Sequence, residues 1–343
     1  MSAEAREHSG RRRFLRIAAV GGLGVAFGGS ALSELVRRAR LREVRVTRTQ
    51  LGTRVSLSVV HRDSDVARAW VEKTFAEIER LEGILSRHRR QTPLARLNRN
   101  GVLPDPPPEL GTVVERALEW AKFTGGAFDP TVAPLLALYE TSAARGTFPS
   151  PEAVERVRQG VGWEGISTDT SSIALARQGM SLTLDGIAKG YVVDQAVATL
   201  AAAGADRVMV NAGGDLASRG ARSGADPWQV GVQDPQNTRG TLGVLRLRGE
   251  ALATSGDYIH NFTPDRALHH ILDPRTGASP LEASGVTVLA PTAMDADALS
   301  TAVFVLGPDE GIILLDQVDG VEGLVVTKAG AQRATRGFAR YAE

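Results

Sequence analysis

The residues best suited to chemistry lie in five short glycine-containing turns, each between predicted helices or strands. In sequence order they are Thr124-Gly125-Gly126-Ala127-Phe128-Asp129-Pro130, Leu184-Asp185-Gly186-Ile187-Ala188-Lys189-Gly190-Tyr191, Asn211-Ala212-Gly213-Gly214-Asp215, Thr254-Ser255-Gly256-Asp257-Tyr258 and His270-Ile271-Leu272-Asp273-Pro274-Arg275-Thr276-Gly277. Glycine lets backbone N–H groups come close to a phosphate, and a following helix N-terminus adds a favourable potential. Any one such turn is more often plain turn geometry. Together, with carboxylates among them, they predict a site for a nucleotide or phosphoester.

Asp297 and Thr301 form a more specific pair, four residues apart in a predicted helix. Residues at this spacing share one helix face, so the carboxylate and the hydroxyl can reach the same cation. Mg²⁺ prefers such oxygen ligands and keeps phosphate oxygens in its shell. Alternatively, Asp297, expected to be exposed, only interacts with the helix dipole, and Thr301 bonds to a backbone carbonyl. Asp295 is expected to point elsewhere, as an ordinary acid of the first helical turn.

The composition and the missing motifs exclude several other kinds of chemistry. The 343 residues are 43% apolar and 23% charged, which is typical of a globular protein. There is no G-x-S-x-G elbow, no H-E-x-x-H helix and no G-x-x-x-x-G-K-[ST] phosphate loop. Without cysteine there is no disulfide framework, thiolate metal site or cysteine nucleophile. A formal net charge of +1 indicates no nucleic-acid partner.

The N-terminus indicates export from the cytoplasm. Arg11-Arg12-Arg13-Phe14-Leu15-Arg16 precedes a nearly charge-free apolar run from Ile17 to Leu32, which is typical of a twin-arginine signal. We interpret residues 1–40 as this signal or anchor segment and residues 41–343 as one domain. The alternatives are a short buried helix or a single-pass anchor, although a membrane span needs about 20 apolar residues.

Hydrophobic periodicity predicts the elements that position the turns. Helices are expected at residues 65–86, 110–123, 152–158, 190–203, 293–305 and 308–318. Strands are expected at residues 55–60, 180–184, 207–211, 228–232, 242–247, 285–289 and 324–327, the last turning into a hairpin at 328–330. The absence of a long linker or a repeat predicts one continuous body of helices and strands.

The chain resembles the ApbE family of FAD:protein FMN transferases in six segments, which are GAFDPT, LDGIAKGYVVD, NAGGDL, TSGDY, HILDPRTG and ADALSTAVFVLG. The earlier Pro93-Leu94-Ala95-Arg96-Leu97-Asn98 is similar to the family's S-x-L-x-x-L-N segment. The resemblance implies a single catalytic domain with an α+β fold, related to the T-fold, in which mixed sheets are flanked by helices. It also implies Mg²⁺-dependent transfer of the FMN moiety of FAD to a serine or threonine hydroxyl of an acceptor protein, with release of AMP.

The resemblance further implies roles for single residues. Asp297 and Thr301 match magnesium ligands, and Gly186 matches a residue whose backbone carbonyl binds the metal. Contacts with the flavin nucleotide are expected from Ala127, Phe128, Asp129, Thr183, Asp185, Lys189, Gly213, Gly214, Asp215, Thr254, Ser255, Gly256 and His270. Many relatives have aspartate at the position of Thr183. Either Asp185 takes over that role, or Thr183 makes the contact as a neutral hydroxyl.

His270, Asp257 and Lys189 are the expected catalytic residues. Transfer from a pyrophosphate depends mainly on positioning and on neutralising charge, so Lys189 and a bound Mg²⁺ would offset charge on the leaving AMP and the transferred phosphoryl group. His270 or Asp257 would accept the proton of the acceptor hydroxyl. The alternative for His270 is a structural role.

Two other functions remain open, a periplasmic FAD pyrophosphatase and a flavin-binding carrier without turnover. The resemblance implies an acceptor flavoprotein with a D-x-x-[ST]-G-A-[ST]-like segment. The export signal predicts a periplasmic or other extracytoplasmic location, with association with the inner membrane through residues 1–40. Asp273 to Ser279 of the chain itself match the acceptor pattern. Because Pro274 and Gly277 shape the site there, no self-modification is expected.

Overall fold

The computed structural model describes residues 41–342, of which residues 42–342 belong to one compact unit. The predicted signal or anchor segment, residues 1–40, lies outside the described residues. Within residues 41–342, no helix has the length and apolar character needed to cross a membrane.

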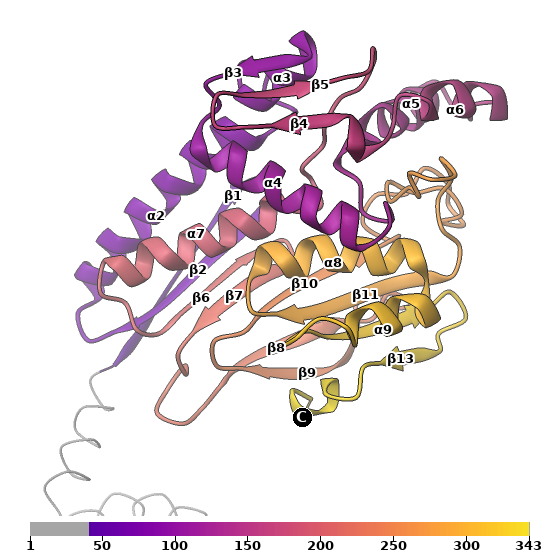
Figure 1. Cartoon of the computed structure of the whole chain (residues 1–343). Coiled ribbons are helices and arrows are strands. Elements are labelled where there is room, and N and C mark those ends of the chain that lie inside the picture. Colours follow the sequence, from indigo (N-terminus) through magenta and orange to yellow (C-terminus); the bar gives the residue numbers. More distant parts are fainter. Residues whose placement is uncertain (1–40, 343) are drawn as a thin grey trace, which may run out of the picture. The chain divides into compact units, whose positions relative to one another are not determined.

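An eight-stranded sheet forms the centre of this unit (Figure 1). Its strands, in spatial order, are β1 (Arg42–Gln50), β2 (Thr53–His61), β6 (Val208–Ala212), β7 (Asp215–Arg219), β10 (Ala251–Gly256), β11 (Ala283–Ala290), β12 (Glu322–Thr327) and β13 (Gln332–Ala334). Every neighbouring pair is antiparallel. In β2, Val55, Leu57 and Val59 are fully buried because alternate side chains point to the same face. β11 is buried along its whole length, which shows that both faces are covered there.

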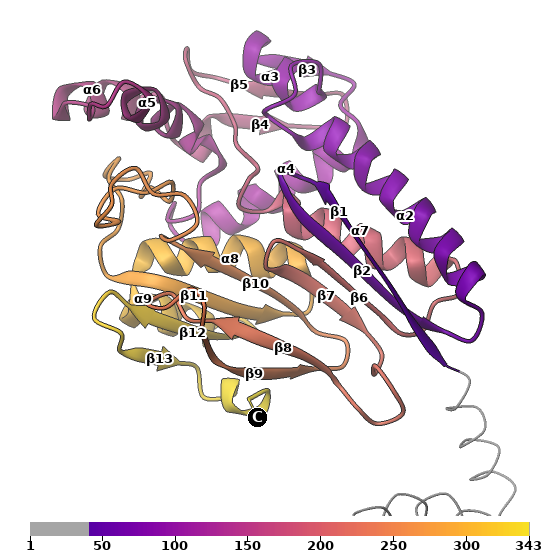
Figure 2. The ribbon, with the colours of Figure 1, turned by 180° about the vertical axis from the view of Figure 1, so that it is seen from behind.

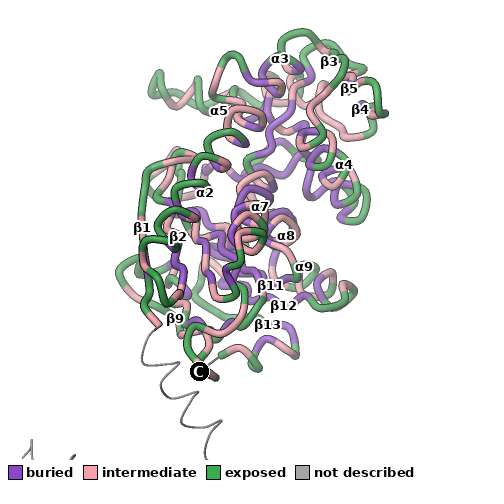
Figure 3. Tube along the Cα trace, turned by 90° about the vertical axis from the view of Figure 1, so that its left-hand side faces the viewer, coloured by how far each residue is buried: buried purple, intermediate pink, exposed green. Residues whose placement is uncertain are grey.

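Helices cover one face of this sheet. α2 (Ser64–Leu85), α7 (Ala188–Ala202) and α8 (Ala293–Leu306) lie on the strands, with α4 (Pro108–Phe123) and α9 (Pro308–Leu315) beside α8 (Figure 1). Asp63 caps the start of α2, because its side chain accepts hydrogen bonds from the first N–H groups of the helix. Buried residues gather along α7, α8 and the strands beneath them (Figure 3). The main core therefore lies between these helices and the sheet.

The opposite face is covered by a hairpin of β8 (Trp228–Gln233) and β9 (Thr241–Leu247), seen from behind in Figure 2. Trp228 and Leu247 of the hairpin pack with Leu216, Leu252 and Leu289 of the large sheet in a second apolar cluster. Burying these side chains on both faces of the sheet supplies most of the favourable free energy of such a fold. The result is three layers, with helices, sheet and hairpin stacked in that order.

A smaller region completes the molecule. It contains a three-stranded sheet in the order β3 (Val102–Pro104), β5 (Ser172–Leu175) and β4 (Ile166–Thr168), together with α3 (Pro93–Asn100), α5 (Ala133–Ala144) and α6 (Pro151–Arg158). Short 3-10 turns, η1 (Pro130–Val132), η2 (Trp163–Gly165) and η3 (Phe338–Arg340), occur between or after these elements. In Figure 1 this small sheet lies beyond α4, on the same side of the large sheet as the helices.

The expected α+β class, with sheets flanked by helices, is confirmed, although the strands within each sheet are antiparallel rather than mixed in direction. All six predicted helices and the hairpin after β12 are present. The strand predicted at residues 180–184 is wrong, because this apolar segment pairs with a side chain instead of a strand. Asn98 accepts a hydrogen bond from the backbone N–H of Leu182 (2.7 Å) and donates one to its carbonyl (2.8 Å).

Candidate active site

α7 and α8 begin at one place, and this crossing carries the predicted metal ligands. Oδ2 of Asp297, on α8, accepts a hydrogen bond from the backbone N–H of Gly190, on α7, at 3.1 Å. A Cβ on Gly190 would collide with the carbonyl oxygen of Ala293 and lie 2.7 Å from the backbone nitrogen of Met294. Glycine is therefore required here for the two helix starts to approach each other.

Gly186 and Thr301 lie side by side at the same crossing. A Cβ on Gly186 would be 3.0 Å from Oγ1 of Thr301. The hydroxyl of Ser255, from β10, lies 3.3 Å from that of Thr301 and 2.8 Å from that of Ser300. The three predicted metal-binding residues, Gly186, Asp297 and Thr301, are thus close together, with one of the predicted cofactor turns beside them.

Asp297 is buried, with 4% of its surface exposed, so the expectation of an exposed acid is wrong. It lies beside a second buried carboxylate, Asp215, and both face the ammonium of Lys189. Nζ of Lys189 is 3.0 Å from Oδ2 of Asp215 in an ion pair. Burial and the negative charge of Asp215 raise the pKa of Asp297 well above its usual range. Burial opposes the charge of Lys189, but Asp215 and Asp297 outweigh it and raise the pKa of the lysine.

This arrangement of charges fits a divalent cation. Two buried carboxylates share one ammonium, and within residues 41–342 Oδ2 of Asp215 has no hydrogen-bond partner, its contact with Lys189 being an ion pair only. An additional positive charge would relieve the repulsion between the two carboxylates. No group of three or more His, Cys, Asp or Glu side chains that could hold a metal occurs in the described part of the chain. The predicted ligand set is of another kind, with one carboxylate, one hydroxyl and one carbonyl oxygen, as suits Mg²⁺ with additional water or phosphate ligands.

Asp185, beside Gly186, forms an ion pair with an arginine that the sequence analysis did not single out. Nε of Arg87 is 2.7 Å from Oδ2 of Asp185, and Nη2 of Arg87 is 3.2 Å from Oε1 of Glu140. Burial opposes ionisation, but contact with His88 and the charge of Arg87 lower the pKa of Asp185. An aspartate already neutralised by arginine is poorly suited to replace the aspartate found in relatives. Arg87 stands in a run of arginines without periodicity, so no sequence signal identified it.

Thr183 is nearly buried, and its hydroxyl oxygen accepts a hydrogen bond from the backbone N–H of Asp185 at 3.2 Å. The backbone N–H of Thr183 donates to the carbonyl of Pro130 at 2.8 Å. These bonds fix the course of the turn that leads to Gly186. Both alternatives for the position where relatives have aspartate stay predictions, because Thr183 and Asp185 are each bonded within the protein.

Ala127, Phe128 and Asp129 are all buried. The carboxylate of Asp129 accepts hydrogen bonds from the backbone N–H groups of Thr131 (2.8 Å) and Trp163 (3.0 Å), so it joins the two short turns η1 and η2. Burial raises the pKa of Asp129. The ring of Phe128 lies close to Gly186. This loop therefore supports the turn that carries Gly186, and its carboxylate is occupied inside the protein.

Gly213 and Gly214 form the two-residue turn between β6 and β7. Ala212 pairs directly with Asp215 across this turn, and both glycines have positive φ, 64° and 112°. Such tight hairpin turns require residues that tolerate positive φ. The turn places Asp215 at the first position of β7, opposite Lys189.

His270 is arranged as a proton acceptor. Its Nδ1 lies 3.0 Å from the carbonyl oxygen of His260. Because a carbonyl oxygen can only accept, Nδ1 carries the proton in the neutral ring and Nε2 has a free lone pair. Burial lowers the pKa of His270 to about 4 against the opposing hydrogen bond to His260, with smaller lowering contributions from the charges of His260, His269 and Lys189. His270 is thus neutral at pH 7 and within electrostatic reach of Lys189.

Asp257 is held in a different environment. It is fully buried, and its carboxylate is 2.5 Å from Nζ of Lys328 and 3.5 Å from Nη1 of Arg266. The hydroxyl of Ser284 donates to it at 3.2 Å. Both oxygens of Asp257 are thus occupied by Lys328, Arg266 and Ser284, so this geometry disfavours Asp257 as the general base and favours His270.

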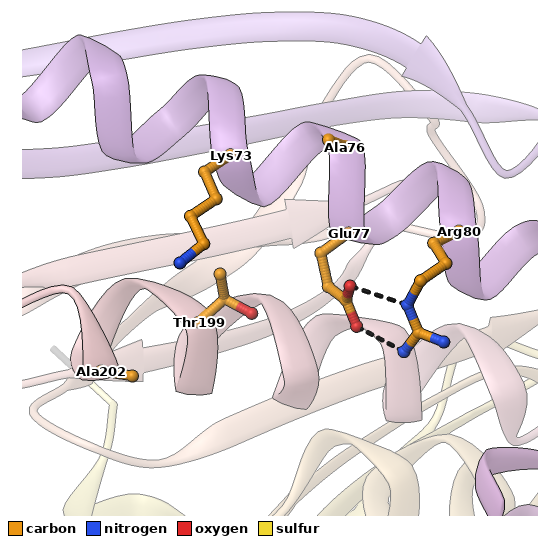
Figure 4. Close-up of a pocket in the computed structure, with 6 residues that line it drawn as sticks. All are labelled: Lys73, Ala76, Glu77, Arg80, Thr199 and Ala202. Carbon is orange, nitrogen blue, oxygen red and sulfur yellow. Dashed lines mark hydrogen bonds and ion pairs between the residues drawn. The ribbon is translucent and has the colours of Figure 1, made fainter.

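A surface depression lies elsewhere, between the outer sides of α2 and α7 (Figure 4). Its volume is about 430 Å³, and it is lined by Lys73, Ala76, Glu77, Arg80, Thr199 and Ala202. Arg80 is paired there with Glu77 at 2.7 Å. This depression contains none of the predicted site residues, and nothing in its lining indicates a ligand.

Comparison with known proteins identifies the family of the chain. The family model described as "ApbE family" matches residues 51–325. The FAD:protein FMN transferase of Treponema pallidum is 33% identical over 324 residues, which cover 88% of this chain and 89% of the relative. The transferase of the same name from Escherichia coli strain K12 is 29% identical, covering 82% and 83%.

Solved structures agree with this similarity. The ApbE protein from Thermotoga maritima superposes with a TM-score of 0.81 at 30% identity, covering 88% of this chain and all of the other. The apo flavinyl transferase ApbE from Pseudomonas stutzeri gives a TM-score of 0.78 at 27% identity, covering 88% and 97%. A match over most of both chains, in sequence and in structure, shows that this chain belongs to the ApbE family.

Proposed function

We propose that this chain is an FAD:protein FMN transferase that moves the FMN moiety of FAD to a serine or threonine hydroxyl of an acceptor protein and releases AMP. One observation carries the proposal within this family, namely that Gly186, Lys189, Asp215, Asp297 and Thr301 meet at the shared start of α7 and α8. The relatives from T. pallidum and E. coli carry the name of this activity.

In the proposed reaction each of these residues has a separate role. The acceptor hydroxyl oxygen forms a bond to the FMN-side phosphorus, the bond from that phosphorus to the bridging oxygen breaks, and AMP leaves with that oxygen. Nε2 of His270 takes the hydroxyl proton, because its neighbour Nδ1 is fixed as a donor. Lys189 places a positive charge beside the pyrophosphate. Asp297, Thr301 and the carbonyl of Gly186 would hold Mg²⁺, which when bound supplies further charge neutralisation.

We also infer that the protein acts outside the cytoplasm. The twin-arginine segment at residues 11–16 and the apolar run after it support export to the periplasm or another extracytoplasmic compartment, with attachment to the inner membrane through residues 1–40. Replacing Arg11 and Arg12 together by lysine should leave the protein in the cytoplasm. Normal export of this variant, measured by cell fractionation, would contradict the signal assignment.

The decisive experiment for the activity is incubation of the purified protein with FAD, Mg²⁺ and a peptide containing D-x-x-T-G-A-T. Mass analysis should show FMN on the second threonine of the peptide's T-G-A-T, and AMP should appear in equal amount. Free FMN formed without the peptide would instead show a pyrophosphatase. FAD binding without any product, unchanged by EDTA, would show a carrier. A peptide with alanine at the modified threonine is the matched control, and it should remain unmodified.

A further inference from the structure

Asp194, on α7, contacts the start of α8 in a way that the proposed reaction does not explain. Its Oδ1 accepts a hydrogen bond from the backbone N–H of Ala293 at 2.8 Å, and its Oδ2 accepts one from Met294 at 2.9 Å. The first N–H groups of a helix have no partner within the helix, and a carboxylate also interacts favourably with the helix dipole there. Both oxygens of one side chain are therefore used on the neighbouring helix.

Asp297 makes the converse contact. It lies on α8, and its Oδ2 accepts from the N–H of Gly190 in the first turn of α7 at 3.1 Å. Each helix thus supplies a carboxylate that binds the N-terminal N–H groups of the other. We call this pair of contacts, Asp194 to Ala293 and Met294, and Asp297 to Gly190, the helix clasp.

The clasp is distinct from ordinary capping of α8. That helix already has its own cap, because Oγ1 of Thr292 accepts from the N–H of Asp295 at 3.1 Å and donates to Oδ2 of the same residue at 2.7 Å. Asp295 is in turn held from α4, at 2.6 Å by Nε of Arg116 and at 2.8 Å by Nε1 of Trp120. Asp194 is the residue that ties α8 to α7 itself, at the point where Gly190 allows backbone contact.

This tie determines the geometry of the site. Gly186 and Lys189 enter from the α7 side, whereas Asp297 and Thr301 enter from α8, and a shift of one helix along the other would separate them. Metal-binding groups lose affinity when the residues that orient them are removed. We propose that Asp194 is a positioning residue, which keeps the start of α8 in register with the turn at residues 184–190 so that Asp297 and Thr301 stay beside Gly186.

The test compares Asp194→Asn with Thr292→Ala, since both weaken hydrogen bonding at the start of α8 but only the first acts on α7. The first measurement, by NMR on metal-free protein, is the hydrogen-exchange rate of the Gly190 amide. Asp194→Asn should speed this exchange about tenfold or more, because asparagine offers one acceptor oxygen where aspartate offers two. Asp194→Glu, which restores both oxygens, should recover much of the protection. Thr292→Ala should keep the exchange rate of the Gly190 amide within about threefold of the wild-type rate. It nevertheless lowers the stability of α8 by an amount comparable to that of Asp194→Asn.

The second measurement is the dissociation constant for Mn²⁺ alone, followed by electron paramagnetic resonance without FAD or acceptor. Asp194→Asn should weaken Mn²⁺ binding about tenfold, while Thr292→Ala should not. This part rests on the proposed function, whereas the exchange measurement does not. If the wild type binds no Mn²⁺ but the exchange results hold, the metal assignment fails and the clasp stands. If Gly190 exchange is unchanged in Asp194→Asn, or if Thr292→Ala has the same effects, Asp194 is an ordinary cap and the proposal is wrong.

Discussion

Two buried charge clusters in this molecule contain an aspartate and a lysine, but they are balanced in opposite ways. At the α7–α8 crossing, Asp215 and Asp297 share the single ammonium of Lys189, and one carboxylate oxygen lacks a hydrogen bond within the described residues. Around Asp257, one carboxylate faces Lys328 and Arg266 and also accepts from a hydroxyl. An unbalanced cluster is unfavourable without a ligand, whereas a satisfied one stabilises the fold. The balance of charge thus separates a site for binding from a structural contact.

The largest effect is expected from removing a charge from the unbalanced cluster. Asp297→Asn should lower the rate of FMN transfer by about a hundredfold to a thousandfold, as when one electrostatic contact to a transition state is lost. The melting temperature in EDTA should stay about the same, because burial and Asp215 already disfavour the charged form of Asp297 in the metal-free protein. Asp309→Asn, an exposed acid in the first turn of α9, is the matched control and should change neither. A large loss of stability in Asp297→Asn would make this residue a structural acid.

The second effect should fall on stability instead of chemistry. Lys328→Met leaves the buried Asp257 with Arg266 at 3.5 Å and the hydroxyl of Ser284, and breaking its ion pair with Lys328 costs about 3 kcal/mol or more. The melting temperature should fall by roughly 5 °C for a domain of this size. Lys73→Met, at an exposed lysine beside α7, should change it by about 1 °C or less. If Lys328→Met remains as stable as wild type but loses activity when folded, the Asp257 cluster belongs to the active site.

The sequence located both aspartates but could not show which cluster binds a ligand and which is a structural contact. Asp257 and Asp297 both lie in motifs, and the motifs do not distinguish them. The role of Asp257 depends on Arg266 and on the distant Lys328, and that of Asp297 on Lys189. Helices with clear apolar periodicity, such as α2, could be predicted nearly to the residue. β1 was missed because it is an edge strand whose exposed arginines conceal the alternation of Val44 and Val46. Contacts such as Asp194 with Ala293 depend on tertiary packing, and no periodicity encodes them.

A smaller effect concerns pH. The pKa of His270 is lowered to about 4 by burial, so a base at this position stays unprotonated well below the usual histidine range. The acid limb of kcat/KM should therefore lie near pH 4 to 5 instead of 6.5. The same pKa shift makes the folded protein less stable at low pH, because the unfolded chain binds this proton at a higher pH than the folded chain does. Stability from this residue is fully present above about pH 6.5 and is lost as the pH falls toward 4. An acid limb at pH 6.5 that disappears in His270→Gln would show that the pKa of His270 is not lowered during catalysis.

The smallest expected effect is no effect at all, at the segment of this chain that resembles an acceptor. Asp273 to Ser279 match the acceptor pattern, but the hydroxyl of Ser279 is buried and bonded twice to one backbone residue. Oγ of Ser279 donates to the carbonyl of His269 at 2.9 Å and accepts from its N–H at 3.0 Å. To attack a phosphorus about 3 to 3.5 Å away, the hydroxyl would have to break both hydrogen bonds and move out of its buried position. These bonds also join Ser279 to the residue next to His270, so leaving would disturb the proposed base. The intact mass after incubation with FAD and Mg²⁺ should therefore show no covalent FMN, and an adduct that disappears in Ser279→Ala would make the chain its own substrate.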